Sequence, residues 1–509
     1  MLLAASFVAA FCGALALSAA PAHAGLFGGK AKATASPSPT PLPMPTATPE
    51  PPNIAIPRLE QKLKDNPDDR QAMTDLATEF LGIGHPEVAV TLTQKLLQLG
   101  TKTAQVYYLD GSAQQSLGNL QVALLDFEQA SDLEPTNLGV LSALADIYTK
   151  ANRMADAERV ATRAVTFNKT EPQAYVTLGI VYASEQKWDD ARKQFETAYS
   201  LDPKDVAPLM QEAQTWVMQN TIPNALTVVD RAIAADPKNV QVLVYRADLY
   251  AKQRDVTRSA SAYDDAAAAA TTDNEKSSVM VRKALMFAAA NRQSDAQATF
   301  NAAIAQYPSI SSLHTAYGEY FLEQHNYAQG EQQLVAALRV NKDDVNALTD
   351  LAQLKESQGK IVDAIGYLKK LTDVAPSAQS FAMLGQAYVS THDYSHAKDA
   401  CSKSFQISRT PDTLGCIAGS DYSLKNYKEA AQIFDVLNAQ IKPFMDRNPQ
   451  LLYMAGVSYS HVNQKGKAVD AYKRLLKMLK PGSKEYKQLQ TQIKDLSKPE
   501  PAKKSTKHS

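Results

Sequence analysis

The chain has 509 residues, more than the roughly 250 to 300 at which a single hydrophobic core stops growing, so several domains or an open-ended repeat are expected. It carries 53 basic and 53 acidic residues and has a formal net charge of zero. This balance argues against a nucleic-acid-binding protein, because neutralising phosphates requires a basic face.

The first 24 residues have the pattern of an export signal. The run from Leu2 to Leu17 is apolar and uncharged, and Ala22-His23-Ala24 has the small-x-small form that signal peptidase cleaves. No Lys or Arg precedes the run, so the true start can lie upstream, or the amino terminus supplies the only positive charge. An uncleaved membrane anchor is the alternative, although the segment is weakly hydrophobic. We predict a signal peptide over 1–24 and an exported protein of the bacterial periplasm or cell envelope, with secretion as a further option.

Residues 25–53 are rich in Pro, Ser and Thr, and nine prolines fall between Pro37 and Pro57. Such a chain cannot pack a core and favours extended polyproline II geometry, so we predict a disordered but semi-rigid linker. It is either a spacer that holds the rest of the chain away from a surface or partner, or a passive linker without a ligand. We favour the passive linker.

The stretch from Ala174 to Pro203 predicts two helices joined by a turn. Its apolar and small residues recur at helical spacing on both sides of the polar Glu185-Gln186-Lys187. They are Tyr175, Leu178, Gly179, Tyr182, Ala191, Phe195 and Ala198. Pro203 has no N–H and a fixed φ, so it ends the second helix. Two such helices bury too little surface to be stable alone and therefore need neighbours.

The same pattern recurs at a period of 34 residues, which leads from Ala191 to Ala157 and Ala123 in one direction and to Ala225 in the other. Helix pairs of this period are typical of a solenoid, in which each pair buries the apolar face of the next. The first six units start at Arg70, Ala104, Leu138, Pro172, Val206 and Val240.

These residues resemble the tetratricopeptide repeat (TPR) family, whose pattern of a bulky residue, Leu-Gly, Tyr, Ala, Phe, Ala and Pro is nearly complete here. Packing agrees with the resemblance: Gly179 and Ala191 are small where two helices approach closely, and Tyr182 and Phe195 fill the space beside that contact. The resemblance implies an all-α fold, an α-solenoid of about twelve TPR helix-turn-helix units in a right-handed superhelix, preceded by the disordered Pro-rich linker.

Six further units with looser spacing start at Ser277, Ser311, Val345, Ala378, Pro411 and Pro449. Extra residues at two junctions, 266–272 and 441–445, are expected to lengthen a helix or bend the stack. Solenoid ends need a polar cover, and we predict a leading helix over Arg58 to Asn66 and a polar final helix over Ser483 to Lys498. The TPR array with its N- and C-terminal capping helices is thus expected over 54–498. A basic tail over 499–509 follows, interpreted as solvated and disordered rather than as an anchor to an anionic surface.

No stretch has the pattern of a catalytic or metal site. The Gly-rich Gly25 to Ala31 lacks the spacing, the Ser or Thr after Lys30 and the following helix of a phosphate-binding loop. His392 and His396 are four residues apart, but the expected inter-helix turn lies between them and no third ligand is near, so an exposed pair is favoured. We expect no enzyme activity, no metal site and no cofactor.

In the family that this chain resembles, the first helices of successive units line a concave groove, and the fifth and ninth residues of each unit point into it. The corresponding residues here are Tyr108, Ser112, Ser142, Asp146, Val176, Ile180, Met210, Gln214, Val244, Asp248, Val281 and Leu285. The centre of this set is apolar, a surface that suits an extended peptide or one face of a helix. The alternative is that several of these residues only pack against neighbouring helices.

Two cysteines remain after removal of the signal, Cys401 and Cys416. Cys401 takes the place of Phe195 in its unit and Cys416 lies in the next helix. Neighbouring helices about 8 to 10 Å apart can bring two Cα atoms within the roughly 4.4 to 6.8 Å that a disulfide needs. Because exported proteins meet an oxidising compartment, we predict a structural disulfide. The alternative is two buried free thiols.

Two functions remain open. The first is an exported scaffold or adaptor that binds a protein or peptide in its concave groove within a cell-envelope assembly. The second is a structural or self-assembling envelope component that holds an exported polymer such as polysaccharide. Nucleic acid is not an expected partner, and the sequence leaves self-association and the partner's identity open.

Overall fold

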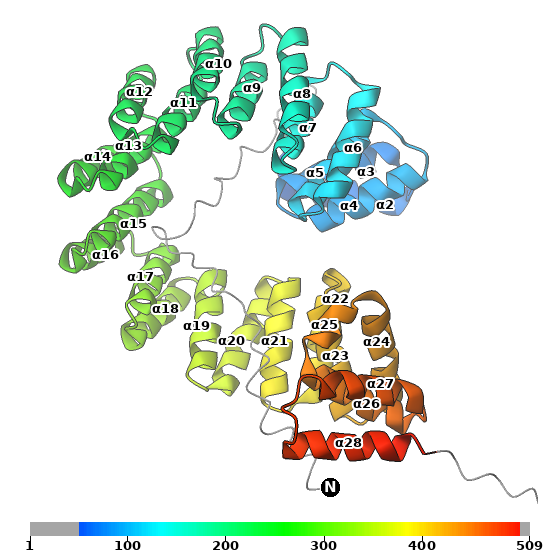
Figure 1. Ribbon diagram of the computed structural model, residues 1–509. Helices are drawn as coiled ribbons and strands as arrows, with labels where there is room; N and C mark the ends of the chain where they lie inside the picture. Colours follow the sequence, from blue (N-terminus) through cyan, green and yellow to red (C-terminus); the bar gives the residue numbers. More distant parts are fainter. Residues whose placement is uncertain (1–49, 499–509) are drawn as a thin grey trace, which may run out of the picture. The chain divides into compact units, whose positions relative to one another are not determined.

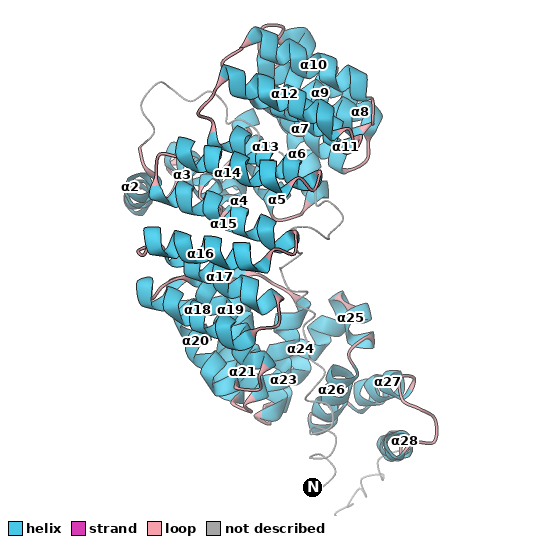
Figure 2. Cartoon of the chain, turned by 90° about the vertical axis from the view of Figure 1, so that its left-hand side faces the viewer, coloured by secondary structure: helices cyan, strands magenta, loops and turns pink. Residues whose placement is uncertain are grey.

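The computed structural model describes residues 50–498. Within them it contains 27 helices and no strand (Figure 1, Figure 2). The predicted all-α fold of tandem helix pairs is confirmed. The predicted signal peptide, most of the linker and the basic tail lie outside the described residues. In the described part of the chain, no helix combines the length and the apolar character needed to cross a membrane.

The described chain divides into two compact bodies between Ala296 and Gln297. In the N-terminal body, α3 to α14 pack as consecutive pairs, and Figure 1 shows α10, α12 and α14 on the outer side of α9, α11 and α13. Its helices are α2 (Pro52–Asp65), α3 (Arg70–Gly82), α4 (Pro86–Gln98), α5 (Ala104–Ser116), α6 (Leu120–Leu133), α7 (Leu138–Lys150), α8 (Met154–Phe167), α9 (Pro172–Ser184), α10 (Trp188–Leu201), α11 (Ala207–Met218), α12 (Ile222–Ala235), α13 (Val240–Lys252), α14 (Val256–Ala269) and α15 (Asp273–Ala289).

The helix α16 (Gln293–Gln306) spans the division, and the C-terminal body continues from it. The following helices are α17 (Ser311–Glu323), α18 (Tyr327–Val340), α19 (Val345–Ser357), α20 (Ile361–Val374), α21 (Ala378–Ser390), α22 (Tyr394–Ile407), α23 (Pro411–Ser423), α24 (Tyr427–Gln440), α25 (Lys442–Asp446), α26 (Pro449–His461), α27 (Lys465–Leu476) and α28 (Lys484–Leu496). The polar final helix packs through Leu489, Ile493 and Leu496 on the last core cluster, as a cap should.

Most first helices begin at the residue predicted from the repeat; α11 begins one residue after the predicted Val206, and two helices begin earlier than predicted. The leading helix starts at Pro52 rather than Arg58, because proline suits the first turn of a helix. α15 starts four residues before Ser277, where the side chain and backbone of Thr272 form a capping box with Glu275. The extra residues at the first junction therefore lengthen a helix, whereas those at the second form the short α25.

A Schellman motif ends the first helix of the α9–α10 pair. The Lys187 N–H donates to the Tyr182 carbonyl and the Gln186 N–H to the Ala183 carbonyl, at 2.9 and 3.0 Å. Gln186 adopts the left-handed conformation that this motif requires, with a φ of 61°. The equivalent turn residue has a positive φ in every helix pair of the described chain, and only three of these residues are glycine. Four others are asparagine, so residue type favours the turn at seven positions and the Schellman hydrogen bonds hold it at the remaining five.

Close packing inside a pair depends on a glycine that faces a bulky side chain. A Cβ added to Gly179 would lie 2.5 Å from the Phe195 ring, so no side chain fits at this position. Ala191 and Ala198, on the same second helix as Phe195, are fully buried. The same close contact, between a glycine of the first helix and the side chain sixteen residues later, recurs at Gly111, Gly318, Gly385 and Gly456.

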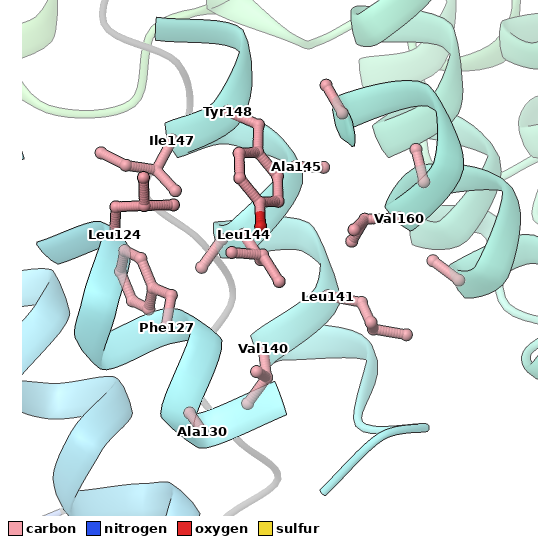
Figure 3. Packing of buried hydrophobic residues seen from close by; sticks show 14 of the residues in the cluster. Leu124, Phe127, Ala130, Val140, Leu141, Leu144, Ala145, Ile147, Tyr148 and Val160 are labelled. Atoms are coloured by element: carbon pink, nitrogen blue, oxygen red, sulfur yellow. The ribbon is translucent and has the colours of Figure 1, made fainter. Parts of the chain in front are cut away.

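Packing between pairs fills the space on both sides of each first helix. Figure 3 shows Leu124 and Phe127 of α6 against Ile147 of α7, while Leu141 of α7 lies toward Val160 of α8. These side chains belong to one buried cluster that runs from α5 to α9. Each pair thus covers the apolar face of the next, which is the condition for a stable solenoid.

Candidate binding groove

A hollow of about 680 Å³ in the N-terminal body is lined by four successive first helices, α3, α5, α7 and α9, and by Pro52 at the start of α2. We call it the groove. The residues that line it besides Pro52 are Thr78, Glu79, Leu81, Gly82, Tyr108, Leu109, Ser112, Gln115, Ser116, Ser142, Ala145, Asp146, Thr149, Lys150, Gln173, Thr177, Ile180 and Val181.

The helical period decides which side chains face the groove. On α5 the lining residues include the fifth (Tyr108), ninth (Ser112), twelfth (Gln115) and thirteenth (Ser116), which share one side of a helix. The family pattern predicts only the fifth and ninth positions. Adding three and four residues to the ninth would have identified the twelfth and thirteenth, and with them Lys150 of α7.

Five of the twelve predicted groove residues line the groove: Tyr108, Ser112, Ser142, Asp146 and Ile180. All five come from α5, α7 and α9, so the structure brings together the N-terminal part of the predicted set. Apart from Ile180, the apolar residues at the centre of the array, which the pattern predicts to form the binding surface, do not line the groove.

The apolar members of the predicted set are largely used in packing. Val176 is 9% exposed and belongs to a core cluster of α9 and α10, and Val244 is 6% exposed. Met210 packs against the core cluster of α11 and α12. Val281 and Leu285 on α15 are half-buried. None of the five lines the groove, because the same helical spacing that predicts a groove face also predicts a core face.

The two polar members of the central set have partners inside the fold. Gln214 accepts a hydrogen bond from the Tyr245 hydroxyl at 2.8 Å. Asp248 accepts one from the Tyr263 hydroxyl and a second from Arg282 at 3.4 Å. Burial raises the pKa of Asp248, and the hydrogen bond from Tyr263 opposes this rise. Both side chains therefore join neighbouring helices, and a role in partner binding stays a prediction.

The polar end of the groove contains a network across two helices. Gln115 on α5 donates to Oδ2 of Asp146 on α7 at 2.7 Å. Lys150, one turn further along α7, donates to the same oxygen at 2.6 Å. Asp146 Oδ1 has no donor among the described residues. The network thus fixes Asp146 in place and leaves one carboxylate oxygen able to accept.

Hydroxyl groups make up much of the remaining lining. Ser112, Ser116, Thr149 and Thr177 each donate to the carbonyl four residues earlier in their own helix, at 2.8 to 2.9 Å. Ser142 on α7 and Thr177 on α9 also lie 2.8 Å apart, oxygen to oxygen. Because these donors are engaged, the hydroxyls present mainly oxygen lone pairs to a ligand.

Tyr108 and Glu79 complete the lining on α5 and α3. Burial raises the pKa of Tyr108 to about 12. Glu79 is half-buried, and its carboxylate has no hydrogen-bond or ion-pair partner in the described chain. The groove therefore combines the aromatic ring of Tyr108, hydroxyl groups that can accept hydrogen bonds, and the unpaired carboxylate of Glu79.

The other predicted site residues lie elsewhere. His392 is the left-handed turn residue between α21 and α22, bonded to Tyr394 at 3.0 Å, and the His396 ring lies 2.7 Å from the Asp393 carboxylate. No group of metal-binding side chains occurs within residues 50–498. The structure joins Cys401 of α22 to Cys416 of α23 through their sulfur atoms, with Cα atoms 6.2 Å apart. That this disulfide forms in the cell stays a prediction.

The chain matches family models of the tetratricopeptide repeat over residues 140–173, 172–205, 219–275 and 315–380. It is 31% identical over 126 residues to the Photosystem I assembly protein Ycf3 of Parasynechococcus marenigrum, a stretch that covers 22% of this chain and 71% of that relative. It is also 28% identical over 131 residues to the human Tetratricopeptide repeat protein 7B, covering 26% of this chain. That match spans only 16% of the human protein.

Solved structures with similar folds include a tetratricopeptide repeat protein from Parabacteroides merdae, with a TM-score of 0.38 and 17% identity over 46% of this chain and 92% of that one. The protein YrrB, described as a TPR protein with an unusual peptide-binding site, has a TM-score of 0.29 and 23% identity. That match covers 36% of this chain and 95% of YrrB.

Proposed function

The chain belongs to the tetratricopeptide repeat family, whose members are protein-interaction scaffolds, and from this premise we propose that it is an exported adaptor that binds an extended segment of a protein partner in its groove. The observation that carries the proposal is the groove itself. Four successive first helices contribute aligned hydrogen-bonding side chains to one hollow, as recognition of an extended chain requires. The partner would belong to a cell-envelope assembly.

Export is supported by the amino-terminal sequence and by the cysteines. The apolar run from Leu2 to Leu17 and the small-x-small Ala22-His23-Ala24 fit a cleaved signal. The pairing of Cys401 with Cys416 fits an oxidising compartment, since disulfides are rare in reducing ones. Fractionation of the host cell tests this part of the proposal, and recovery of the uncleaved chain from the cytoplasm would contradict it.

Binding without catalysis is the role that the groove supports. Its lining combines hydroxyls bonded to their own helices with a Gln-Asp-Lys network, and no nucleophile in it is paired with a general base. A further relative, the human Protein O-mannosyl-transferase TMTC1, is 24% identical over 134 residues, which are 15% of its length. We propose no transferase activity on the basis of so short a stretch.

A substitution that fills the groove without disturbing the fold tests the proposal. Gly82 lines the groove, and a Cβ added there would meet nothing within 4 Å. Gly82→Trp should therefore fold normally and obstruct the ligand. The matched control is Gly366→Trp on α20, since a Cβ at this exposed helical glycine also meets nothing and Gly366 does not line the groove.

The experiment is a selection of random decapeptides displayed on phage against the immobilised full-length chain. We expect clones that bind the natural sequence and Gly366→Trp but lose at least tenfold in affinity for Gly82→Trp. If every selected clone binds all three chains equally, the groove is not the binding site. Light scattering adds an independent check, because mass that rises with concentration would favour the self-assembling structural component.

A further inference from the structure

The charge of the groove lining is unbalanced toward the acidic side. Glu79 and Asp146 are its carboxylates, and Lys150 is its one ammonium group. Lys150 already donates to Asp146 at 2.6 Å, so its charge is compensated within the protein. Glu79 has no such partner in the described chain and leaves a net charge of minus one. A ligand with a positive group near Glu79 would compensate this charge, whereas an acidic one would be repelled.

The hydrogen-bonding capacity of the lining is biased toward acceptors. The hydroxyls of Ser112, Ser116, Thr149 and Thr177 donate to their own helices, so oxygen lone pairs remain for a ligand. The free Oδ1 of Asp146 adds another acceptor. Such a surface suits a ligand rich in donors, and a peptide with backbone N–H groups and a Lys or Arg side chain offers them.

The extent of the groove suits an extended segment rather than a compact ligand. It crosses four successive first helices, and a spacing of about 9 Å between neighbouring helices would give a span of roughly 27 Å. An extended peptide covers this span with about eight residues at roughly 3.3 Å each. Pro52 of α2 bounds the end at α3, where Glu79 lies.

We infer that the groove binds an extended, basic peptide segment that places a Lys or Arg side chain against Glu79 and donates backbone and side-chain hydrogens to the hydroxyls and Asp146. The inference rests on the proposed function and names the chemistry of its partner. Glu79 sets the charge preference, and the Gln115–Asp146–Lys150 network holds the second acidic group in position.

To test the inference, the clones from the same decapeptide selection are sequenced. The selection is then repeated on Glu79→Lys and Glu79→Gln. Circular dichroism checks that both variants keep their helicity. Among clones that Gly82→Trp excludes, we expect Lys and Arg to outnumber Asp and Glu. A selected basic peptide should bind Glu79→Gln about fivefold more weakly, since a partly exposed ion pair contributes about 1 kcal/mol. Glu79→Lys should select acidic sequences instead.

Two results would overturn the inference while leaving the proposed function intact. One is a set of groove-dependent clones without an excess of basic residues; the other is selection of the same sequences by Glu79→Lys. Displacement of the peptides by a neutral glucose hexasaccharide at equal concentration would also overturn it, in favour of a carbohydrate ligand. Absence of any clone that Gly82→Trp excludes would contradict the inference and the proposed function together.

Discussion

Single residues decide how closely the helices of one pair approach. Gly179 has no room for a side chain, because a Cβ would lie 2.5 Å from the Phe195 ring. We predict that Gly179→Ala lowers the stability of the fold by about 1 to 3 kcal/mol, the usual cost of overpacking. Thermal unfolding followed by circular dichroism measures the change. Gly366→Ala is the control, expected to leave the melting temperature equal or slightly higher, since its Cβ meets nothing.

A pair of carboxyl groups makes the stability of the N-terminal body depend on pH. Asp126 of α6 lies beside the buried Asp110 of α5, which also accepts a hydrogen bond from Thr93. Burial, and then the charge of Asp110, raises the pKa of Asp126 to about 7, above its unfolded value of 3.8. The folded state therefore binds a proton that the unfolded state has released, and this stabilisation is lost as the pH rises through about 7.

Asp126→Asn removes that dependence, because an amide stays neutral and can still donate to Asp110. We predict that the variant melts above the natural protein at pH 8 and that the difference shrinks toward pH 4. Melting curves at both pH values test this. An advantage of the same size at pH 4 and pH 8 would show that titration of Asp126 does not contribute.

At the scale of elements, an ion pair joins α22 and α23 at a first-helix position where several other pairs have an aromatic residue. Tyr182 and Tyr388 occupy this position in their first helices, whereas α23 has Asp421, 1% exposed, with the Lys398 ammonium at 2.7 Å. Lys398→Met would leave the buried charge uncompensated, and we expect a loss of about 3 kcal/mol. The double variant Lys398→Met, Asp421→Leu should recover most of it. A double variant that melts no higher than the single one would contradict this account.

The same two helices carry the cysteines. Cys401 occupies the position of Phe195 in its pair and lies against Gly385, and its Cα is 6.2 Å from that of Cys416. We predict no free thiol in the denatured, unreduced mature protein, and an intact monomer on a non-reducing gel. For a loop of about 15 residues the bridge should contribute roughly 3 kcal/mol. Two titratable thiols per chain would establish the free-thiol alternative.

Much of the element level is predictable from the sequence because the repeat fixes it. The spacing from Ala191 identifies the helix pairs, and the small size of Gly179 identifies the close contact. The turns are less predictable, since Gln186 and most of its equivalents adopt a left-handed backbone without being glycine. The Schellman hydrogen bonds hold this conformation even at Gln186, although Gly and Asn are the residues usually found there.

The position of the groove in the whole chain was harder to predict than the fold. Tyr108 and Ile180 were identified by their place in the repeat, but so was Val176, which does not line the groove. Residues at the same repeat position differ in whether they border the groove, because the packing of neighbouring side chains differs from pair to pair. Gln115 and Lys150 were missed although helical spacing could have included them. The repeat pattern does not encode the side-chain packing that decides where successive helices leave a hollow between them.

The central claim, that the groove binds an extended peptide, is tested most directly by locating a bound peptide. A groove-selected decapeptide carrying a photoreactive benzophenone is cross-linked to the full-length chain, and the joined residues are identified by mass spectrometry. We predict cross-links on α3, α5, α7 and α9, at lining residues such as Gln115 and Ile180, and their loss in Gly82→Trp but not in Gly366→Trp. Cross-links confined to second helices or to the C-terminal body would contradict the account.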